Sequence, residues 1–325
     1  MKQCCNILLT SAGKRVALLK EFKETLGRLI PDAKVFTTEL NPLLSPAAAL
    51  SDGCFKVPRV TEEGYIDSLY EVCRGNEVGL VVPTIDTELL VLAQNREQFT
   101  EIGCNVIVSD YDFIALCRDK RKTGAFFTSK GIRVPQERDK DNPVFPMFAK
   151  PYDGSLSKDI YVLRSVEDIT PEVRSNEKLM FMEYIDKEKY SEYTVDLYYN
   201  AKGELMCLVP RERLEIRAGE INKGITRKNY VYSFLHERLK NIAGARGCIC
   251  AQLFYCAENN DVVGIEINPR FGGGYPLSYA AGANYPEYLI REYLMDEVIE
   301  PFGDWSDAML MLRYDDAVFI KGAGL

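Results

Sequence analysis

The first 110 residues alternate short apolar runs with amphipathic stretches, and this alternation restricts the possible folds more than any other feature of the sequence. The apolar runs are 6–10, 34–38, 79–83 and 105–108, each short enough for a buried strand. Between the first two, residues 16–30 carry apolar side chains at helical spacing until Pro31 ends the helix. Strands that alternate with helices predict a parallel sheet covered by helices, here a Rossmann-like domain. The first turn lacks the G-x-G-x-x-G sequence, so a dinucleotide site is not supported.

The pattern changes near residue 145 to short strands separated by turn signals, which predicts an α+β fold with mostly antiparallel strands. The expected strands are 147–150, 160–163, 179–183, 193–199, 205–209, 251–256 and 262–267, with a helix at 232–245. A turn at 259–261 joins the last two strands into a hairpin. Residues 309–314 are a candidate for a final strand. The predicted fold class is therefore α/β followed by α+β.

Composition excludes several kinds of function. The chain has 40 Lys and Arg against 48 Asp and Glu, and a net charge of -8 has the wrong sign for a nucleic-acid partner. His236 is the only histidine, which is too few for a multi-histidine zinc site and leaves little for a Ser-His-Asp triad. None of the ten cysteines forms a C-x-x-C pair, and no apolar run approaches the ~18 residues of a membrane span. We therefore expect a soluble, cytoplasmic protein with reduced cysteines and no membrane partner.

The strongest local signal is the sequence from Gly264 to Gly274, in which polar and apolar residues alternate. Alternation along a strand places Glu266, Asn268 and Arg270 on one face, while the isoleucines between them point into the core. Carboxylate and amide oxygens suit Mg²⁺, and a planar guanidinium suits a phosphoryl group. Gln252 would lie opposite this face across the hairpin and support the same ion. An exposed polar edge strand is the alternative.

Two earlier clusters are weaker signals. Lys150 leaves an apolar strand and precedes a short Gly/Ser segment at 153–158, an arrangement that can surround phosphates. The segment is not a P-loop, and a surface hairpin is its alternative. Glu183 and Glu192 flank a linker where backbone groups can meet an adenine edge and a carboxylate can accept from ribose hydroxyls. For these two residues, ordinary solvated carboxylates are the alternative.

In this order the clusters resemble the ATP-grasp superfamily, and within it a single synthetase unit of the carbamoyl phosphate synthase large subunit. The matching pieces are Asp119-Lys120 with Thr123, Ala149-Lys150-Pro151 with the loop 153–157, Met182-Glu183-Tyr184-Ile185, Glu192, Gln252 and Glu266-Ile267-Asn268-Pro269-Arg270. The last piece is the most specific, and the similarity covers about residues 1–300. The resemblance implies a nucleotide held between two α+β subdomains, with a glycine-containing loop that closes over its phosphates.

The resemblance also implies roles for individual residues. The ATP-binding set is Lys120, Lys150, Gly154, Ser155, Glu183, Ile185 and Glu192. In it the two lysines contact the phosphates, Glu183 and the backbone of Ile185 contact the adenine, and Glu192 contacts the ribose. Gln252, Glu266 and Asn268 would hold Mg²⁺ or Mn²⁺. Arg270 would stabilise the transferred phosphoryl group, and Lys223, in a polar loop at 222–226, is a second candidate catalytic residue.

The activity implied is that of an ATP- and Mg²⁺-dependent ligase, which activates a small carboxylate as an acyl-phosphate and joins it to an amine. Only one synthetase unit is present, and nothing in the sequence resembles an amidotransferase partner or an allosteric domain. Full carbamoyl phosphate synthesis is therefore disfavoured. The alternatives are carbamoyl phosphate synthase-like phosphorylation of bicarbonate or carbamate, and an ATP-binding sensor that performs no ligation.

Two further groups of charged residues are candidates for substrate contacts. Arg211, Arg213 and Arg217 alternate along one segment, where they either place cations beside a substrate carboxylate or form a charged exposed strand. Asp86 and Glu88 follow a buried strand at its carboxyl end, where α/β sheets bind ligands. They either hold an amine or cap the next helix.

The resemblance divides the chain into a Rossmann-like pre-ATP-grasp domain at 1–109, an ATP-grasp domain at 110–300 and a C-terminal tail at 301–325. Within the ATP-grasp domain, a lid at about 124–185 precedes a metal-bearing body at about 186–300. The expected partners are small-molecule carboxylate and amine substrates. A homodimer is a further expectation from the resemblance.

Overall fold

The N-terminal part of the chain forms a five-stranded parallel sheet. The computed structural model describes residues 4–154, 159–217 and 219–322, and its first sheet has the strand order β3-β2-β1-β4-β5. These strands are β1 (Asn6–Thr10), β2 (Val35–Glu39), β3 (Cys54–Lys56), β4 (Val78–Pro83) and β5 (Asn105–Val106). Because β1 and β4 are buried almost throughout, their continuous apolar runs fit a sheet covered on both faces. The predicted Rossmann-like arrangement is confirmed.

The helices of this part are α1 (Val16–Leu29), α2 (Pro46–Leu50), α3 (Tyr65–Gly75) and α4 (Asp86–Thr100), with a 3-10 turn at Pro42–Leu44. Along α1 the apolar residues Leu19, Phe22 and Leu26 are buried, as their spacing predicts, and the helix ends before Pro31. Two details differ from expectation. The edge strand β3 was not predicted, because only one of its three residues is strongly apolar, and β5 is two residues shorter than expected.

Two antiparallel sheets form the rest of the molecule. The smaller contains β6 (Met147–Pro151), β7 (Tyr161–Leu163) and β8 (Leu179–Glu183) in the order β7-β6-β8, beside the short helix α7 (Pro171–Ser175) and a 3-10 turn at Val166–Asp168. The larger has the order β13-β12-β9-β10-β11-β14. Its strands are β9 (Ser191–Tyr199), β10 (Leu205–Arg217), β11 (Glu220–Thr226), β12 (Gly247–Cys256), β13 (Asp261–Asn268) and β14 (Leu310–Leu312). The helices α5 (Tyr111–Arg118), α6 (Lys120–Ser129), α8 (Tyr230–Arg238), α9 (Tyr275–Ala280) and α10 (Tyr285–Leu294) accompany this sheet.

This second half confirms the α+β prediction and corrects it in two places. The helix expected at 232–245 ends at Arg238, and Gly244, within the expected range, adopts a φ of +77° that a helix cannot contain. The polar loop expected at 222–226 is part of β11, which lies between β10 and β14. The candidate final strand is confirmed as β14, although it covers only three residues.

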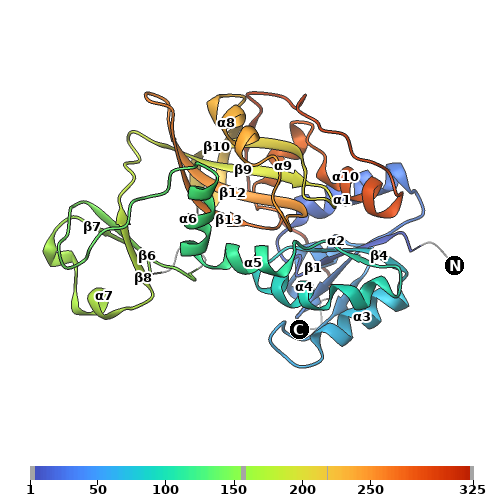
Figure 1. The fold of residues 1–325 in the computed structure, drawn as a ribbon. Helices are drawn as coiled ribbons and strands as arrows, with labels where there is room; N and C mark the ends of the chain where they lie inside the picture. Colours follow the sequence, from blue (N-terminus) through green and yellow to red (C-terminus); the bar gives the residue numbers. More distant parts are fainter. Residues whose placement is uncertain (1–3, 155–158, 218, 323–325) are drawn as a thin grey trace.

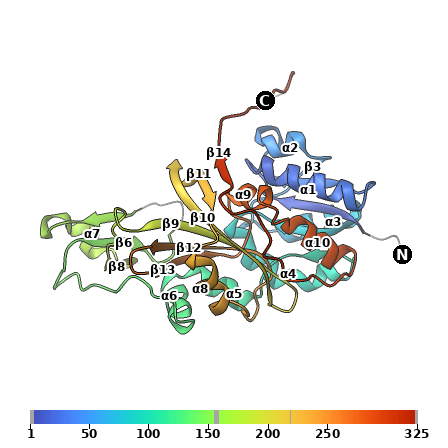
Figure 2. The ribbon, with the colours of Figure 1, turned by 90° about the horizontal axis from the view of Figure 1, so that it is seen from above.

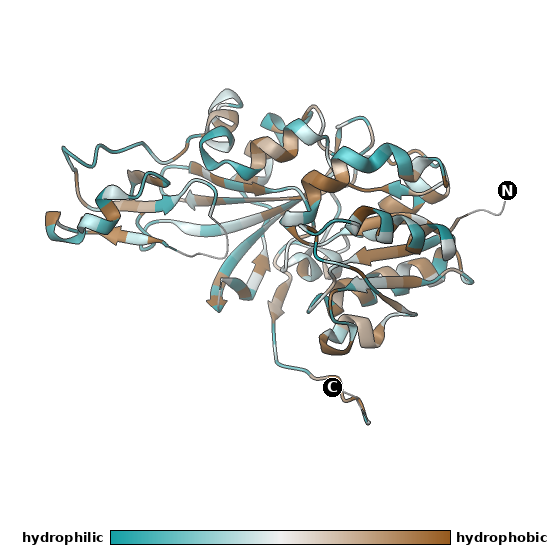
Figure 3. Ribbon diagram, turned by 90° about the horizontal axis from the view of Figure 1, so that it is seen from below, coloured by the Kyte–Doolittle hydropathy of each residue, from teal (hydrophilic) through white to brown (hydrophobic). Residues whose placement is uncertain are grey.

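A shared core holds the two large sheets close together. In Figure 1 the small sheet lies at the left, the six-stranded sheet in the centre and the parallel sheet at the lower right. Leu19 and Phe22 of α1 belong to the same apolar cluster as Phe271, Tyr275 and residues of α10. Figure 2 shows the segment after β14 leaving the body, and Figure 3 shows hydrophobic residues along the strands. The predicted boundaries at 109/110 and 300/301 stay predictions.

No helix among the described residues is long and apolar enough to cross a membrane.

The carboxyl group of Glu21, on α1, is buried at this shared core. Glu21 is 7% exposed, and among the described residues its Oε2 atom has no hydrogen-bond partner. Burial raises the pKa of Glu21 to about 8, and the nearby Asp196 and Glu24 act in the same direction. Between the ordinary value of 4.5 and about 8, the folded protein therefore binds one proton more than the unfolded chain. Stability should fall as the pH rises through this range.

We expect Glu21→Gln to remove this pH dependence, because a neutral amide has no proton to lose. Between pH 6 and pH 8, the free energy of unfolding of the wild type should fall by about 2 kcal/mol more than that of the variant. Denaturant titrations at both pH values measure this difference. Glu101→Gln, at an exposed position that does not act on Glu21, is the control and should keep the wild-type slope. Parallel pH profiles for wild type and Glu21→Gln would contradict a protonated Glu21.

Candidate functional site

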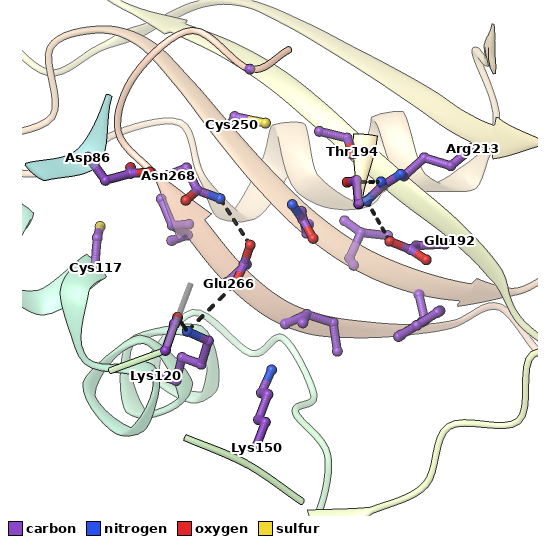
Figure 4. Close-up of a pocket in the computed structure, with 18 of the residues that line it drawn as sticks. Asp86, Cys117, Lys120, Lys150, Glu192, Thr194, Arg213, Cys250, Glu266 and Asn268 are labelled. Atoms are coloured by element: carbon purple, nitrogen blue, oxygen red, sulfur yellow. Dashed lines mark hydrogen bonds and ion pairs between the residues drawn. The ribbon is translucent and has the colours of Figure 1, made fainter. Parts of the chain in front are cut away.

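A cavity of about 640 Å³ lies where the three sheets approach one another. The N-terminal domain contributes Arg15 and Asp86, the small sheet contributes Lys150, and the six-stranded sheet contributes Glu192 and Glu266. Figure 4 shows Lys120 and Lys150 on the opposite side of the cavity from Glu192 and Arg213, with Glu266 between. A cavity of this size accommodates a small-molecule ligand such as a nucleotide.

The hairpin of β12 and β13 places the predicted metal ligands together. Gln252 and Glu266 are direct cross-strand partners, as their spacing around the 259–261 turn predicts. The side-chain amide of Asn268 donates to Glu266 Oε1 at 3.1 Å. The other carboxylate oxygen, Oε2, lies 3.9 Å from the ammonium of Lys120. Glu266 therefore stands at the centre of the polar cluster, with all three oxygen-bearing side chains on the cavity wall.

These three side chains fit one hard cation that shares its coordination with a phosphate. The side-chain amide nitrogen of Asn268 donates to Glu266, so the side-chain oxygen of Asn268 can face an ion. Mg²⁺ usually takes one or two protein carboxylates and completes its shell with water and substrate phosphates. Among the described residues, no three His, Cys, Asp or Glu side chains cluster into a metal site. The donor set thus suits an ion that arrives with a nucleotide.

Two lysines approach this cluster from different elements. Lys120 begins α6, whose first turn is capped by Asp119, and its ammonium donates to the carbonyl of Gly154 at 2.5 Å. The hydroxyl of Thr123 donates to the carbonyls of Leu116 in α5 and of Asp119, and so helps to fix this turn against α5. Lys150 projects from β6. Burial lowers its pKa to about 8, with Glu266 opposing the shift and Lys120 adding to it.

The side of the cavity between the two antiparallel sheets combines apolar walls with free backbone groups. Phe148, Met182, Leu253 and Ile265 line it. The backbone N–H and C=O of Ile185 take part in no hydrogen bond within the described residues. Such a slot suits a flat heterocycle with hydrogen-bonding edges.

The two predicted nucleotide carboxylates of this region both have protein partners. Glu183 is paired with Arg133 at 2.5 Å and accepts from the backbone N–H of Gln136. Glu192 is paired with Arg213 at 2.6 Å. Both residues line the cavity. The structure thus places Glu183 and Glu192 where they were predicted, but each carboxylate also holds a neighbouring segment of the protein.

Arg270 connects the metal strand to the N-terminal domain. Its Nε and Nη2 atoms both donate to Oδ2 of Asp86, at 3.2 and 2.7 Å. Burial acts to lower the pKa of Arg270, but the nearby Asp86 raises it overall, so Arg270 stays a cation. The helix-capping alternative for Asp86 and Glu88 is wrong, because α4 starts without a side-chain cap. Glu88 is buried and accepts hydrogen bonds from Thr10 and Ser11 instead.

The three arginines of β10 have different environments. Arg211 is buried and donates two hydrogen bonds to Asp196, at 2.7 and 2.9 Å. Arg213 is paired with Glu192, and the side chain of Arg217 is 75% exposed near Asp315. The alternative of a uniformly exposed charged strand is therefore wrong. Arg211 and Arg213 do line the cavity, but their guanidinium groups are already paired.

Comparison with known proteins identifies the fold of this site. The family "PylC-like, N-terminal domain" matches residues 7–107, and the family "ATP-grasp in the biosynthetic pathway with Ter operon" matches residues 175–310. The chain is an ATP-grasp protein with a PylC-like N-terminal domain. A comparison with curated protein sequences gives no match.

Solved structures share the architecture of this ATP-grasp protein. N5-carboxyaminoimidazole synthetase from Staphylococcus aureus, crystallised with ADP, is 14% identical with a TM-score of 0.72, covering 97% of this chain and 83% of that chain. L-amino acid ligase from Bacillus licheniformis is 15% identical with a TM-score of 0.66, covering 90% and 75%. The biotin carboxylase domain dimer of Hydrogenobacter thermophilus 2-oxoglutarate carboxylase, crystallised with MgADP and bicarbonate, is 13% identical with a TM-score of 0.67, covering 90% and 70%. At these identities the likeness shows the fold.

One predicted site residue is not brought to the cavity of this ATP-grasp protein, and another is not described. Lys223 lies on β11, is half exposed, and is paired with Glu215 outside the cavity lining. Ser155 lies outside the described residues. Gly154 does line the cavity, where its carbonyl accepts from Lys120. The remaining predicted residues all line the same cavity.

Arg15 is a cavity residue that the sequence interpretation missed. It follows β1 at its carboxyl end, the position where α/β sheets bind ligands. The same rule singled out Asp86 after β4. Applied to the segment Ser11-Ala12-Gly13-Lys14-Arg15, it would have marked an arginine beside the site.

The lowered pKa of Lys150 gives a test of the ATP-grasp site. At pH 8 about half of the Lys150 side chains are neutral in the free protein, and nucleotide phosphates favour the ammonium form. We expect ADP binding to take up about 0.5 proton at pH 8 and almost none at pH 6. The affinity should fall as the pH rises through 8. Calorimetric titrations in buffers of different ionisation enthalpy measure the proton count.

Lys150→Arg is the matched variant, because a guanidinium stays charged throughout this pH range. It should bind ADP without the proton uptake seen at pH 8. Equal uptake in wild type and in Lys150→Arg would show that another group titrates, and would contradict the prediction that Lys150 contacts the phosphates.

Proposed function

We propose that the chain is an ATP- and Mg²⁺-dependent ligase that activates a small carboxylate as an acyl-phosphate and joins it to an amine. The observation that carries this proposal is a single cavity, within an ATP-grasp fold, that joins two lysines, the Gln252, Glu266 and Asn268 cluster, and Arg270. These groups supply positive charge and cation ligands without a dedicated nucleophile. Phosphoryl transfer depends mostly on such positioning and electrostatic stabilisation.

In this proposal the nucleotide enters between the two antiparallel sheets. The adenine occupies the apolar slot, with its edge on the backbone of Ile185, and Glu192 contacts the ribose. Lys120 and Lys150 hold the phosphates near Glu266. Glu183 acts mainly by fixing the 133–136 segment, because its carboxylate is already bonded there. Gln252, Glu266 and Asn268 are the ligands for Mg²⁺, which supplies charge neutralisation on the phosphates when bound.

The chemistry has two steps. A carboxylate oxygen of the substrate attacks the γ-phosphorus of ATP, an O–P bond forms, and the bond to the bridging oxygen breaks to release ADP. An amine nitrogen then attacks the acyl carbon, a C–N bond forms, the C–O bond to phosphate breaks, and the amine loses its proton to water. Arg270, held by Asp86, offers its remaining N–H groups to the transferred phosphoryl oxygens. One histidine in the whole chain is no obstacle, because neither step needs an imidazole.

A second candidate is phosphorylation of bicarbonate as the acid. A structural relative with biotin carboxylase activity was crystallised with MgADP and bicarbonate. The same lysines, cation ligands and Arg270 would serve that reaction. The proposal also includes domain boundaries at residues 109/110 and 300/301. It further includes a homodimer and the use of Mn²⁺ in place of Mg²⁺.

Release of ADP that depends on an added substrate tests the function. Protein, Mg²⁺ and ATP are incubated with single carboxylic acids, single amino acids, their pairwise mixtures, or bicarbonate alone. A ligase should release ADP with an acid and amine pair and yield the amide, whereas bicarbonate alone should support release only under the second candidate. Binding of Mg-ATP without ADP release in any mixture would indicate the sensor alternative.

The Glu266→Gln variant tests whether Glu266 is needed to bind the metal ion rather than to fold the protein. The substitution keeps the shape and removes the only carboxylate of the cation cluster, so we expect substrate-dependent ADP release to fall by at least about 100-fold. The thermal midpoint should change little, because Glu266 is on the cavity wall. Glu258→Gln, an exposed glutamate at the end of the same hairpin, should keep full activity. Wild-type turnover in Glu266→Gln would remove the metal assignment.

A further inference from the structure

Arg15 is a cation in the cavity whose charge has no protein partner. Arg15 lines the cavity, and its guanidinium lies against Gly273, three residues after Arg270. Within residues 4–154, 159–217 and 219–322 no carboxylate lies within ion-pair distance of it, and no side-chain hydrogen bond satisfies it. By contrast, Arg211, Arg213 and Arg270 in the same cavity are each paired with a carboxylate. Among the described residues Arg118 also lines the cavity without an ion pair, but it ends α5 on the side of Lys120. A partly buried charge without a partner is costly, which points to a ligand.

The groups around Arg15 have other partners. Burial lowers the pKa of Arg15, Arg270 adds to this effect, and Glu220, Cys250 and Asp86 oppose it. Of the two carboxylates, Asp86 is bound to Arg270 and Glu220 is paired with Arg313 at 3.0 Å. Neither neutralises Arg15 directly.

The loop that carries Arg15 is held rigidly. Ser11 donates to the buried Glu88, and the backbone N–H of Gly13 donates to Glu39. Thr84 donates to the carbonyls of Thr10 and Ser11. These contacts fix the backbone of the turn between β1 and α1, from which Arg15 projects. A fixed backbone lowers the conformational entropy that the turn loses when a ligand binds.

The Gly272-Gly273-Gly274 turn makes room for this arginine. A Cβ atom on Gly273 would lie 3.1 Å from Nη1 of Arg15, and one on Gly274 would lie 2.1 Å from Nη1 of Arg211. Glycine at these positions allows two guanidinium groups to approach the backbone after the metal strand. The space beside Arg15 is therefore built into the same segment that carries Arg270.

We infer that Arg15 binds a carboxylate of the substrate other than the one that is activated. The inference rests on the proposed function. Glu266 faces Lys120, Arg270 follows it along the same segment, and Gly273, further along, lies against Arg15. Arg15 therefore lies past Arg270 from Lys120, and in this proposal it meets the part of the substrate that does not react. A guanidinium presents two parallel N–H groups that match a planar carboxylate. The substrate class is a small molecule with a second, unreacting carboxylate.

Direct binding tests this without relying on turnover. Full-length protein saturated with Mg-ADP is titrated calorimetrically with the proteinogenic L-amino acids, with succinate and glutarate, and with the matching amides that lack one carboxylate. We expect at least one carboxylate to bind, and its amide to bind at least about 10-fold more weakly. Arg15→Gln should weaken the carboxylate by about 10- to 100-fold, and Arg15→Lys should restore part of the loss.

Two controls separate this inference from general damage and from failure of the proposed function. Lys14→Gln, the exposed neighbour, should bind the carboxylate as wild type does, and Arg15→Gln should bind Mg-ADP with unchanged affinity. If the wild-type protein binds no Mg-ADP, the proposed function is contradicted. The carboxylates are then titrated into the nucleotide-free protein, which tests the role of Arg15 separately. The role of Arg15 is overturned if no carboxylate binds, if binding is unchanged in Arg15→Gln, or if phosphate monoesters show the Arg15 dependence instead.

Discussion

The buried ion pair between Asp196 and Arg211 is the interaction on which the cavity depends. Both side chains are essentially inaccessible, and Ser278 adds a hydrogen bond to the same carboxylate at 2.6 Å. Tyr285 donates to the backbone carbonyl of Asp196. The pair thus joins β9 and β10 to α9 and α10. Removing one partner of such a pair typically costs about 3–5 kcal/mol, because the other charge stays buried.

The position of this pair determines which arginines are available to a ligand. Arg211 is committed to Asp196, and its guanidinium occupies the space left by Gly274. Arg270 is committed to Asp86 across the domain junction, where it keeps N–H groups for a phosphoryl oxygen. Arg15, beside Gly273, has no carboxylate within ion-pair distance among the described residues. A chain with a net charge of -8 therefore contains a locally cationic cavity, which is what an anionic nucleotide and an anionic substrate require.

Local patterns predicted most of the fold. The buried run at β1, the amphipathic helix α1 and the hairpin with Gln252 opposite Glu266 depend on neighbouring residues, so periodicity and turn chemistry were sufficient. The misses depend on tertiary structure. β11 is too polar to be recognised as a strand, and it forms because β10 and β14 pair with it on both sides.

In the site, too, features set by neighbouring residues were predicted and those set by tertiary structure were not. The residues of the metal strand were predicted from alternation, but their partners were not. Asp86 meets Arg270 across 184 positions, and the sequence alone gives no sign of that pairing. Arg211 was predicted as a candidate for a substrate contact. The sequence did not reveal its burial against Asp196, because that burial depends on the register of β9 and β10. Lys223 was placed in a polar loop, whereas the register of β10 and β11 places it opposite Glu215.

The central claim is that a substrate carboxylate becomes phosphorylated in this cavity. Tracing of oxygen atoms tests it most directly. An acid labelled with ¹⁸O in its carboxylate is incubated with the amine, Mg-ATP and the enzyme, and the released phosphate is analysed by mass spectrometry. The account predicts one ¹⁸O atom in each phosphate released, because the acyl carbon–oxygen bond breaks in the second step. Phosphate without ¹⁸O, released at the rate of amide formation, would contradict an acyl-phosphate and with it the proposed function.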